Sequence, residues 1–150
     1  MNFRLNSILW SFLFAVSVYL ITGSNRGIGL EYCRQLKASG HKVIATCRSS
    51  SSELDAVGVR VESGVDVTSG ESVLNLRKKL EGIQIDVLIQ NAGIAEFNSL
   101  SNLDPVSIMR QFEVNALSPL CFTHAFMRNL RKGSKVVLMT SRMGSIDDNC

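Results

Sequence analysis

The sequence predicts an α/β protein: a doubly wound parallel sheet with helices on both faces, in three layers α/β/α. Short β-branched or apolar runs alternate along the chain with segments whose apolar residues recur at helical spacing. Strands that alternate with helices form parallel sheets, because each right-handed crossover places its helix over the sheet. The length of 150 residues is enough for one domain with its own core.

The first half of the chain reads as strand, helix, strand, loop, strand. An apolar run over residues 16–21 is the first predicted strand, and an amphipathic helix follows and ends at Gly40. Residues 41–47 are β-branched and predict the second strand. The serine-rich residues 48–53 are interpreted as a loop, and a third strand is expected within residues 59–67.

The next predicted helix begins with a capping box. Thr68 is followed three residues later by Glu71, the spacing at which the two side chains cap each other's backbone N–H groups. The apolar run of residues 85–90 then predicts a buried fourth strand.

A long helix is expected after a polar loop. Asp104 suits the N-cap and Pro105 the first helical position. Pro119 predicts a kink or an early end, because proline lacks the N–H that the helix ladder needs, with helix resuming to about Leu130. Residues 135–140 are the fifth predicted strand.

The N-terminus carries an apolar run over residues 8–21. It is short for a bilayer span, which needs ~20 apolar residues, and it suits the apolar part of a signal peptide. Its last part is needed as the first strand. Residues 1–16 are therefore interpreted as an extension, either a start-site artefact or a weak membrane anchor, ahead of a domain of residues 17–150.

The composition limits the kinds of binding partner and the cellular compartment that we expect. The net charge of +3 comes without a basic run, so no nucleic acid partner is predicted. The four cysteines form no Cys-x-x-Cys pair, which indicates reduced thiols and no metal site. We therefore expect a cytoplasmic protein. Membrane association through residues 1–21 is the alternative.

Three glycines lie in the turn where the first predicted strand ends and the first predicted helix begins. A helix N-terminus binds phosphate through its unpaired N–H groups and its dipole, if the backbone can approach closely. Gly23 would allow the tight turn, Gly27 the approach of a pyrophosphate, and Gly29 the packing of helix on sheet. The simpler alternative is that these glycines only mark a turn. Their place between strand and helix favours a Rossmann-type dinucleotide site.

Other polar residues end the later strands. Asp66 ends the third, residues 91–93 the fourth and Ser141 the fifth. Because the carboxyl ends of parallel strands share one edge, all of them are expected beside the glycine turn.

Five motifs occur in the order of one known family. They are TGSNRGIG (residues 22–29), DV (66–67), NAG (91–93), VNALSP (114–119) and VVLMTSRMGS (136–145). Over residues 17–145 the chain resembles the short-chain dehydrogenase/reductase family, and within it the small carbonyl reductases of the C-factor type. The resemblance implies an NAD(P)-binding Rossmann domain that, in this sequence, stops after the fifth strand.

The resemblance also implies roles for single residues. Asp66 would bind the adenine amino group, with a turn former as the alternative reading. Asn91 would brace the sheet near the cofactor. Asn115 would hold an active-site lysine through a water, or be a polar group satisfied by backbone, and Ser141 would donate to the substrate carbonyl. The full set of implied cofactor contacts is Gly23, Ser24, Asn25, Arg26, Gly27, Ile28, Gly29, Arg48, Asp66, Val67, Asn91, Ala92 and Gly93.

The family's proton donor is not in the sequence. In the family a Tyr-x-x-x-Lys motif lies further along than Cys150, and the lysine lowers the pKa of the tyrosine. Tyr19 and Tyr32 are the only tyrosines here, and neither is followed by lysine four residues on. The chain is thus interpreted as an inactive N-terminal fragment of an oxidoreductase acting on a small carbonyl or alcohol. The alternative is a non-catalytic nucleotide-binding module or a non-functional truncated product.

Without the family's last two strands, the fifth strand would be an exposed apolar edge, and the chain is expected to be poorly soluble. Ile108, Phe112 and Phe122 are expected in water for the same reason. The oligomeric state is left open: family members often dimerise through the helix that here covers residues 104–130 together with the following helix, which this sequence lacks.

Two arginines predict the choice of cofactor. Arg26 lies in the glycine turn and Arg48 follows the second strand, where residues 47–49 supply no carboxylate for a free ribose hydroxyl. A guanidinium pairs well with a 2′-phosphate, so NADP(H) is predicted over NAD(H). The alternative is that both arginines are merely solvated.

Overall fold

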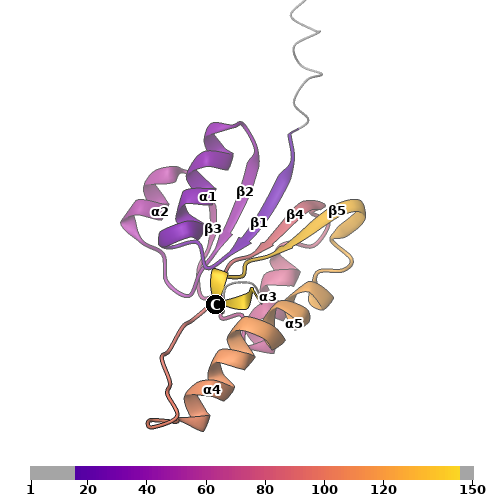
Figure 1. The fold of residues 1–150 in the computed structure, drawn as a ribbon. Coiled ribbons are helices and arrows are strands. Elements are labelled where there is room, and N and C mark those ends of the chain that lie inside the picture. Colours follow the sequence, from indigo (N-terminus) through magenta and orange to yellow (C-terminus); the bar gives the residue numbers. More distant parts are fainter. Residues whose placement is uncertain (1–15, 146–150) are drawn as a thin grey trace, which may run out of the picture.

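Five parallel strands form one sheet, as the sequence predicts, and their order is β3-β2-β1-β4-β5 (Figure 1). The computed structural model describes residues 16–145. The strands are β1 (Val18–Thr22), β2 (Lys42–Thr46), β3 (Arg60–Glu62), β4 (Ile85–Gln90) and β5 (Leu130–Leu138). The predicted extension over residues 1–16 lies outside the described residues except for Val16. In residues 16–145 we find no helix with the length and apolar character that a membrane span requires.

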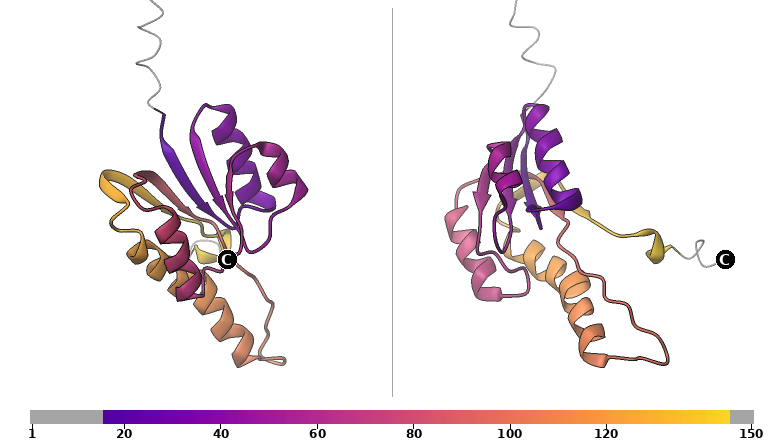
Figure 2. Two further views of the ribbon diagram at one scale, coloured as in Figure 1. Left: turned by 180° about the vertical axis from the view of Figure 1, so that it is seen from behind. Right: turned by 90° about the vertical axis from the view of Figure 1, so that its left-hand side faces the viewer.

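Helices cover both faces of the sheet (Figure 2). On one face α1 (Gly27–Ala38) and α2 (Ser52–Val57) bury Leu30, Cys33 and Leu54 against the strands. On the other face α3 (Gly70–Lys79) and α5 (Ser118–Ala125) bury a second apolar cluster. The predicted three-layer arrangement is therefore confirmed, with one hydrophobic cluster on each side of the sheet.

Two helix starts differ from the sequence prediction. The serine-rich stretch is not all loop, because α2 begins at Ser52 and the Ser51 hydroxyl oxygen accepts from the N–H of Leu54. The cap of α3 is Ser69 rather than Thr68, with the Ser69 oxygen accepting from the N–H of Ser72. Serine and threonine both cap helices, so a run of them leaves the choice of cap to tertiary contacts.

The long helix is divided near Pro119, as expected. Asp104 caps α4 (Pro105–Phe112) by accepting from the N–H of Val106. A π-helical turn, η2 (Glu113–Leu117), joins α4 to α5. Pro119 lies in the first turn of α5, directly after this π-helical turn. The helix then ends at Ala125, earlier than predicted.

Strand β5 is longer than predicted and irregular. It pairs with β4 at Ile85↔Leu130, and then in regular register from Val87↔Lys135. Gly133, with φ +96°, lies within the extra residues that β5 inserts between these pairs. Only glycine adopts this backbone conformation readily, so Gly133 permits the irregularity of the strand.

Two of the three apolar side chains that were expected in water are exposed. Phe112 is 57% exposed and Ile108 is also exposed. The expectation for Phe122 is wrong, because it is fully buried and stacks on Phe126 with ring centroids 4.8 Å apart. Phe122 faces the sheet beneath α5, so its burial does not depend on any element beyond β5.

We expect Phe122→Ala to lower the free energy of unfolding by about 3–5 kcal/mol, since it removes a fully buried ring. Phe112→Ala is the matched control and should cost less than about 1 kcal/mol. Urea unfolding followed by circular dichroism measures both. Equal losses for the two variants would contradict the placement of Phe122 in the core.

The outer edge of β5 should drive self-association, because Val137 is 36% exposed and Leu138 is 61% exposed on a strand without an outer neighbour among residues 16–145. We expect Val137→Lys to reduce the particle size measured by light scattering. Leu100→Lys removes a fully exposed apolar side chain in the loop after β4, away from the edge, and should change little. The same reduction from both substitutions would show that the strand edge is not responsible.

Candidate functional site

A cleft of about 800 Å³ opens at the carboxyl ends of the strands. It is the switch point of the sheet, where β1 lies between β2 and β4 and neighbouring crossovers run in opposite directions. All the predicted cofactor contacts line this cleft except Ser24 and Gly29. Five segments that are far apart in the sequence thus meet at one cavity.

The glycine turn needs glycine for two different reasons. Gly23 has φ +68°, and a Cβ there would lie 2.8 Å from Cα of Ala92. A Cβ on Gly29 would lie 2.3 Å from the carbonyl oxygen of Gly23, so α1 can approach the turn only without a side chain at this position. At Gly27, in contrast, a Cβ would meet nothing within 4 Å. The backbone at the start of α1 is therefore open to the cleft.

The ends of β1 and β4 are joined by a network of hydrogen bonds. The Thr22 hydroxyl oxygen accepts from the backbone N–H groups of Asn91 and Ala92, each at 3.0 Å. In return the Asn91 side-chain amide donates to the carbonyl oxygens of Thr22 and Gly23, also at 3.0 Å. This network fixes the glycine turn against the Asn-Ala-Gly turn. Sequence reasoning missed Thr22, although it opens the TGSNRGIG motif.

Ser24 supports the turn from beneath. It is fully buried, its hydroxyl donates to the carbonyl oxygen of Ile21 at 2.9 Å, and its backbone N–H donates to that of Thr46 at 3.0 Å. Its neighbour Asn25 lines the cleft and accepts a hydrogen bond from the Ser51 hydroxyl at 2.7 Å. The turn is thereby held from β2 and from the start of α2 as well.

Asp66 stays ionised in the cleft. Its Oδ1 accepts from the N–H of Thr68 at 2.9 Å and from the Thr68 hydroxyl at 2.7 Å. These two hydrogen bonds lower the pKa of the Asp66 carboxyl, partial burial opposes them, and the charge of Arg48 adds a smaller lowering. Thr68, expected as a helix cap, instead orients this carboxylate.

Positive charge gathers at the same cleft. Arg26 is exposed at the N-cap of α1, where its side chain makes no capping hydrogen bond, and Arg48 is exposed just beyond β2. Neither forms an ion pair with another residue in the described range 16–145. Both guanidinium groups are free to meet an anion.

A smaller cavity of about 390 Å³ shares residues 91–93 with the cleft. Its walls include Leu120, Val136 and Leu138, so it is largely apolar. Asn115 also lines it from the π-helical turn η2. The amide of Asn115 donates to the carbonyl oxygen of Ile94 at 2.7 Å and accepts from the N–H of Ile94 at 2.9 Å. Asn115 is therefore satisfied by backbone and fixes the loop after β4.

Ser141 lies beyond this cavity rather than in its lining. It is exposed at the N-cap of η3 (Arg142–Gly144), and its side chain makes no capping hydrogen bond. Met139, two residues earlier, does line the cavity and accepts a hydrogen bond at Sδ from the Tyr32 hydroxyl at 3.6 Å. The end of β5 is thus tied to α1, and Ser141 follows it at the rim.

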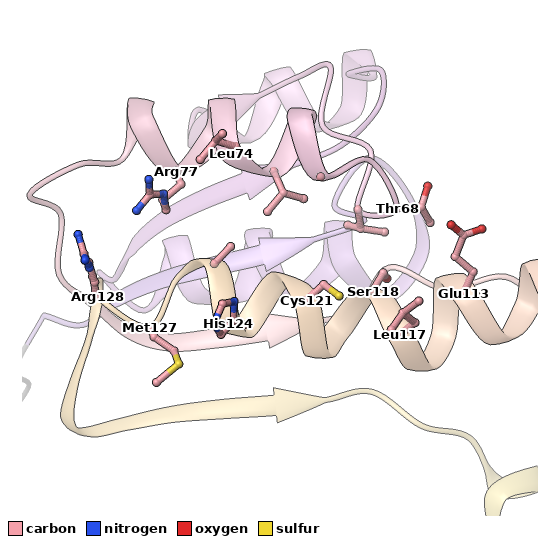
Figure 3. A pocket seen from close by; sticks show the side chains of 14 residues that line it. Thr68, Leu74, Arg77, Glu113, Leu117, Ser118, Cys121, His124, Met127 and Arg128 are labelled. Atoms are coloured by element: carbon pink, nitrogen blue, oxygen red, sulfur yellow. The ribbon is translucent and has the colours of Figure 1, made fainter.

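A separate groove of about 830 Å³ runs between α3 and α5 (Figure 3). Figure 3 shows Leu74 and Arg77 on the α3 side facing Cys121 and His124 on the α5 side. The groove lies on the outer face of two helices, whereas ligands of open α/β sheets bind beyond the strand ends. It shares Val67, Thr68 and Glu113 with the cleft.

Known proteins share this sequence pattern. The chain is 40% identical over 136 residues to the 1-hydroxy-2-glutathionyl-2-methyl-3-butene dehydrogenase of Rhodococcus sp. (strain AD45). The matched residues make up 89% of this chain and 60% of that protein. This chain therefore spans about three-fifths of the length of that relative.

Solved structures share the fold. The carbonyl reductase of Pseudomonas aeruginosa PAO1 superposes with a TM-score of 0.81 at 27% identity, over 88% of this chain and 65% of that one. The carbonyl reductase from chicken fatty liver, solved with NADPH bound, has a TM-score of 0.76 at 26% identity, over 90% of this chain and 63% of that one.

The family assignment follows from sequence and fold together. The family model described as short chain dehydrogenase matches residues 17–148, nearly the whole chain. The strand order, the glycine turn and the Asn-Ala-Gly turn described above all lie within that match. This chain belongs to the short-chain dehydrogenase family.

Proposed function

We propose that this chain is the cofactor-binding part of an NADP-dependent oxidoreductase, which transfers hydride between NADP(H) and a carbonyl or alcohol substrate. The single observation that carries the proposal is the cleft at the start of α1, where open backbone and two unpaired arginines meet. Carbonyl reductases with the same fold, one of them solved with NADPH, support it.

The residues of the cleft fit a dinucleotide phosphate. The exposed N–H groups at the start of α1 suit the pyrophosphate, and Gly27 leaves the space for it. Arg48 and Arg26 suit a ribose 2′-phosphate, and the ionised Asp66 would accept from the adenine amino group. When bound, the nicotinamide supplies or takes up the hydride.

The substrate would occupy the smaller cavity beside residues 91–93. Its apolar walls exclude water, and the Ser141 hydroxyl at its rim would donate to the substrate carbonyl oxygen as negative charge develops there. Asn115 lines the same cavity, and the hydrogen bonds between its amide and the backbone of Ile94 hold the loop after β4 in place.

The proton donor is the part that these residues do not supply. Tyr19 lies in β1 and Tyr32 donates its hydroxyl to Met139 across the sheet edge, and neither tyrosine lines the cleft or the smaller cavity. We therefore propose that the 150-residue chain is a fragment without the family's catalytic tyrosine and lysine. Binding without catalysis is the activity expected of it.

The relative from Rhodococcus suggests a first substrate to assay. Its name describes a hydroxy compound that carries a glutathionyl group. Glutathionyl alcohols and aldehydes therefore join simple aldehydes and quinones in the panel for a complete enzyme. We propose a homo-oligomer only as a possible state of a complete enzyme and not of this chain.

We further propose a cytoplasmic location. Burial raises the pKa of the thiols of Cys33 and Cys47, and Cys121 is a free exposed thiol. Unpaired thiols and NADP(H) chemistry both belong to a reducing compartment.

The chain should bind NADPH more tightly than NADH, because Arg48 and Arg26 offer charge-assisted hydrogen bonds to the 2′-phosphate. Arg48→Gln should weaken NADPH binding about ten- to hundredfold and leave NADH binding nearly unchanged. Isothermal titration calorimetry measures both cofactors. Arg34→Gln, on the exposed side of α1, is the control and should behave like the wild type. Equal or tighter binding of NADH by the wild type would overturn the proposed preference.

The 150-residue chain should oxidise no measurable NADPH with aldehydes, quinones or glutathionyl aldehydes. The absent general acid would contribute ~10² to 10⁴-fold to the rate, and Ser141 cannot replace it because a serine hydroxyl is too weak an acid near neutral pH. The loss of absorbance of NADPH measures turnover. Turnover by the purified chain, free of other reductases, would mean that another residue of the chain provides the proton.

A further inference from the structure

The groove between α3 and α5 is a second candidate ligand site (Figure 3). Its volume of about 830 Å³ is that of a cleft which takes a small molecule. It meets the cofactor cleft at one end, and of the predicted cofactor contacts it is lined by Val67 alone. The groove therefore has space that the proposed cofactor does not use.

The floor of the groove is apolar. Helices α3 and α5 pack together on the sheet through the buried cluster that contains Val73 and Phe122. Above this cluster the groove is lined by Val67, Leu74, Leu117, Ala125 and Met127. Leu74 is 41% exposed and Leu117 is 44% exposed. An apolar ligand that covered them would remove this surface from water, which is favourable.

The two ends of the groove carry opposite charges. Figure 3 shows Arg77 and Arg128 together at one end, and Thr68 and Glu113 at the other. Neither Arg77 nor Arg128 forms an ion pair with a residue of the described range. A carboxylate would find two guanidinium groups at the first end, whereas Glu113 would repel it at the second.

The groove is long and narrow. An α-helix rises about 1.5 Å per residue, so the helical stretch from Glu113 to Ala125 is about 18 Å long. The axes of two helices in contact lie about 8–10 Å apart, which leaves a furrow suited to an extended alkyl chain. An apolar furrow with cations at one end only suits a ligand that has one anionic head and one apolar tail.

We propose that this groove binds a fatty acid, with the carboxylate between Arg77 and Arg128 and the alkyl chain along the floor toward Glu113. The outer edge of β5 lies on the other side of α5 from α3, so pairing at that edge would leave the groove open. This proposal does not depend on the proposed oxidoreductase activity.

The experiment titrates the full 150-residue chain with laurate, below its micelle-forming concentration, by calorimetry and by the reactivity of Cys121. Cys121 is an exposed thiol that lines the groove, whereas Cys33 and Cys47 are buried. A Cys150→Ser background removes the remaining thiol, which lies outside the described residues. Bound laurate should slow the reaction of Cys121 with a disulfide reagent, because the alkyl chain covers the groove.

Two further probes separate the head of the ligand from its tail. Octanoate has four CH₂ groups fewer than laurate and should bind at least roughly tenfold more weakly. Dodecyltrimethylammonium has a chain of the same length with a cationic head, and it should leave the reaction of Cys121 nearly unchanged because Arg77 and Arg128 repel it.

The variant Arg77→Gln/Arg128→Gln should lose roughly thirtyfold in affinity for laurate. Lys78→Gln/Lys132→Gln removes the same charge from exposed positions outside the groove and should bind like the wild type. Circular dichroism checks that each variant is folded. No protection of Cys121 by laurate, equal loss in both variants, or equal binding of the cationic amphiphile would overturn the proposal. Protection that grows with protein concentration in the absence of laurate would also overturn it, because the occupant would then be a second copy of the chain.

Discussion

The candidate site depends on one exchange of hydrogen bonds, between Thr22 at the end of β1 and Asn91 at the end of β4. Their strands come from distant parts of the sequence, and the exchange satisfies backbone groups that would otherwise be orphaned where the ladder stops. It also brings Gly23 against Ala92 so closely that no Cβ fits. The cleft can form only because this corner of the sheet closes without side chains, which leaves the N–H groups of α1 exposed.

Much of this was predictable because it is local or periodic. The five strands, the glycine turn, the cap at Asp104 and the break near Pro119 each follow from a short stretch whose residues have few alternatives. The choice between Thr68 and Ser69 as a cap was not local. Thr68 is recruited by the Asp66 carboxylate, which leaves Ser69 to the helix. The sequence shows both hydroxyls but not which hydrogen bond each of them makes in the fold.

Burial was the harder property to predict. Phe112 and Phe122 have the same side chain on one continuous helical pattern, yet the first is exposed and the second is in the core. The π-helical turn η2 lies between them and adds a residue to the helix, which rotates the faces of α4 and α5 relative to each other. Phe122 was expected in water because elements beyond the fifth strand are missing, but its ring packs in the cluster between α5 and the sheet, which needs no such element.

The two halves of the site are supported very differently. The cofactor half is held by β1, β2, β4 and α2 through Asn91, Ser24 and Ser51, so its shape is set by contacts already present. The substrate half ends at Ser141, which follows a strand with one neighbour among residues 16–145. The end of that strand is tied to α1 by the contact of Tyr32 with Met139. Preorganised donors stabilise developing charge, and a donor held from one side is poorly preorganised. Cofactor binding and carbonyl chemistry therefore have separate structural requirements in this fold, and residues 16–145 meet the first far better than the second.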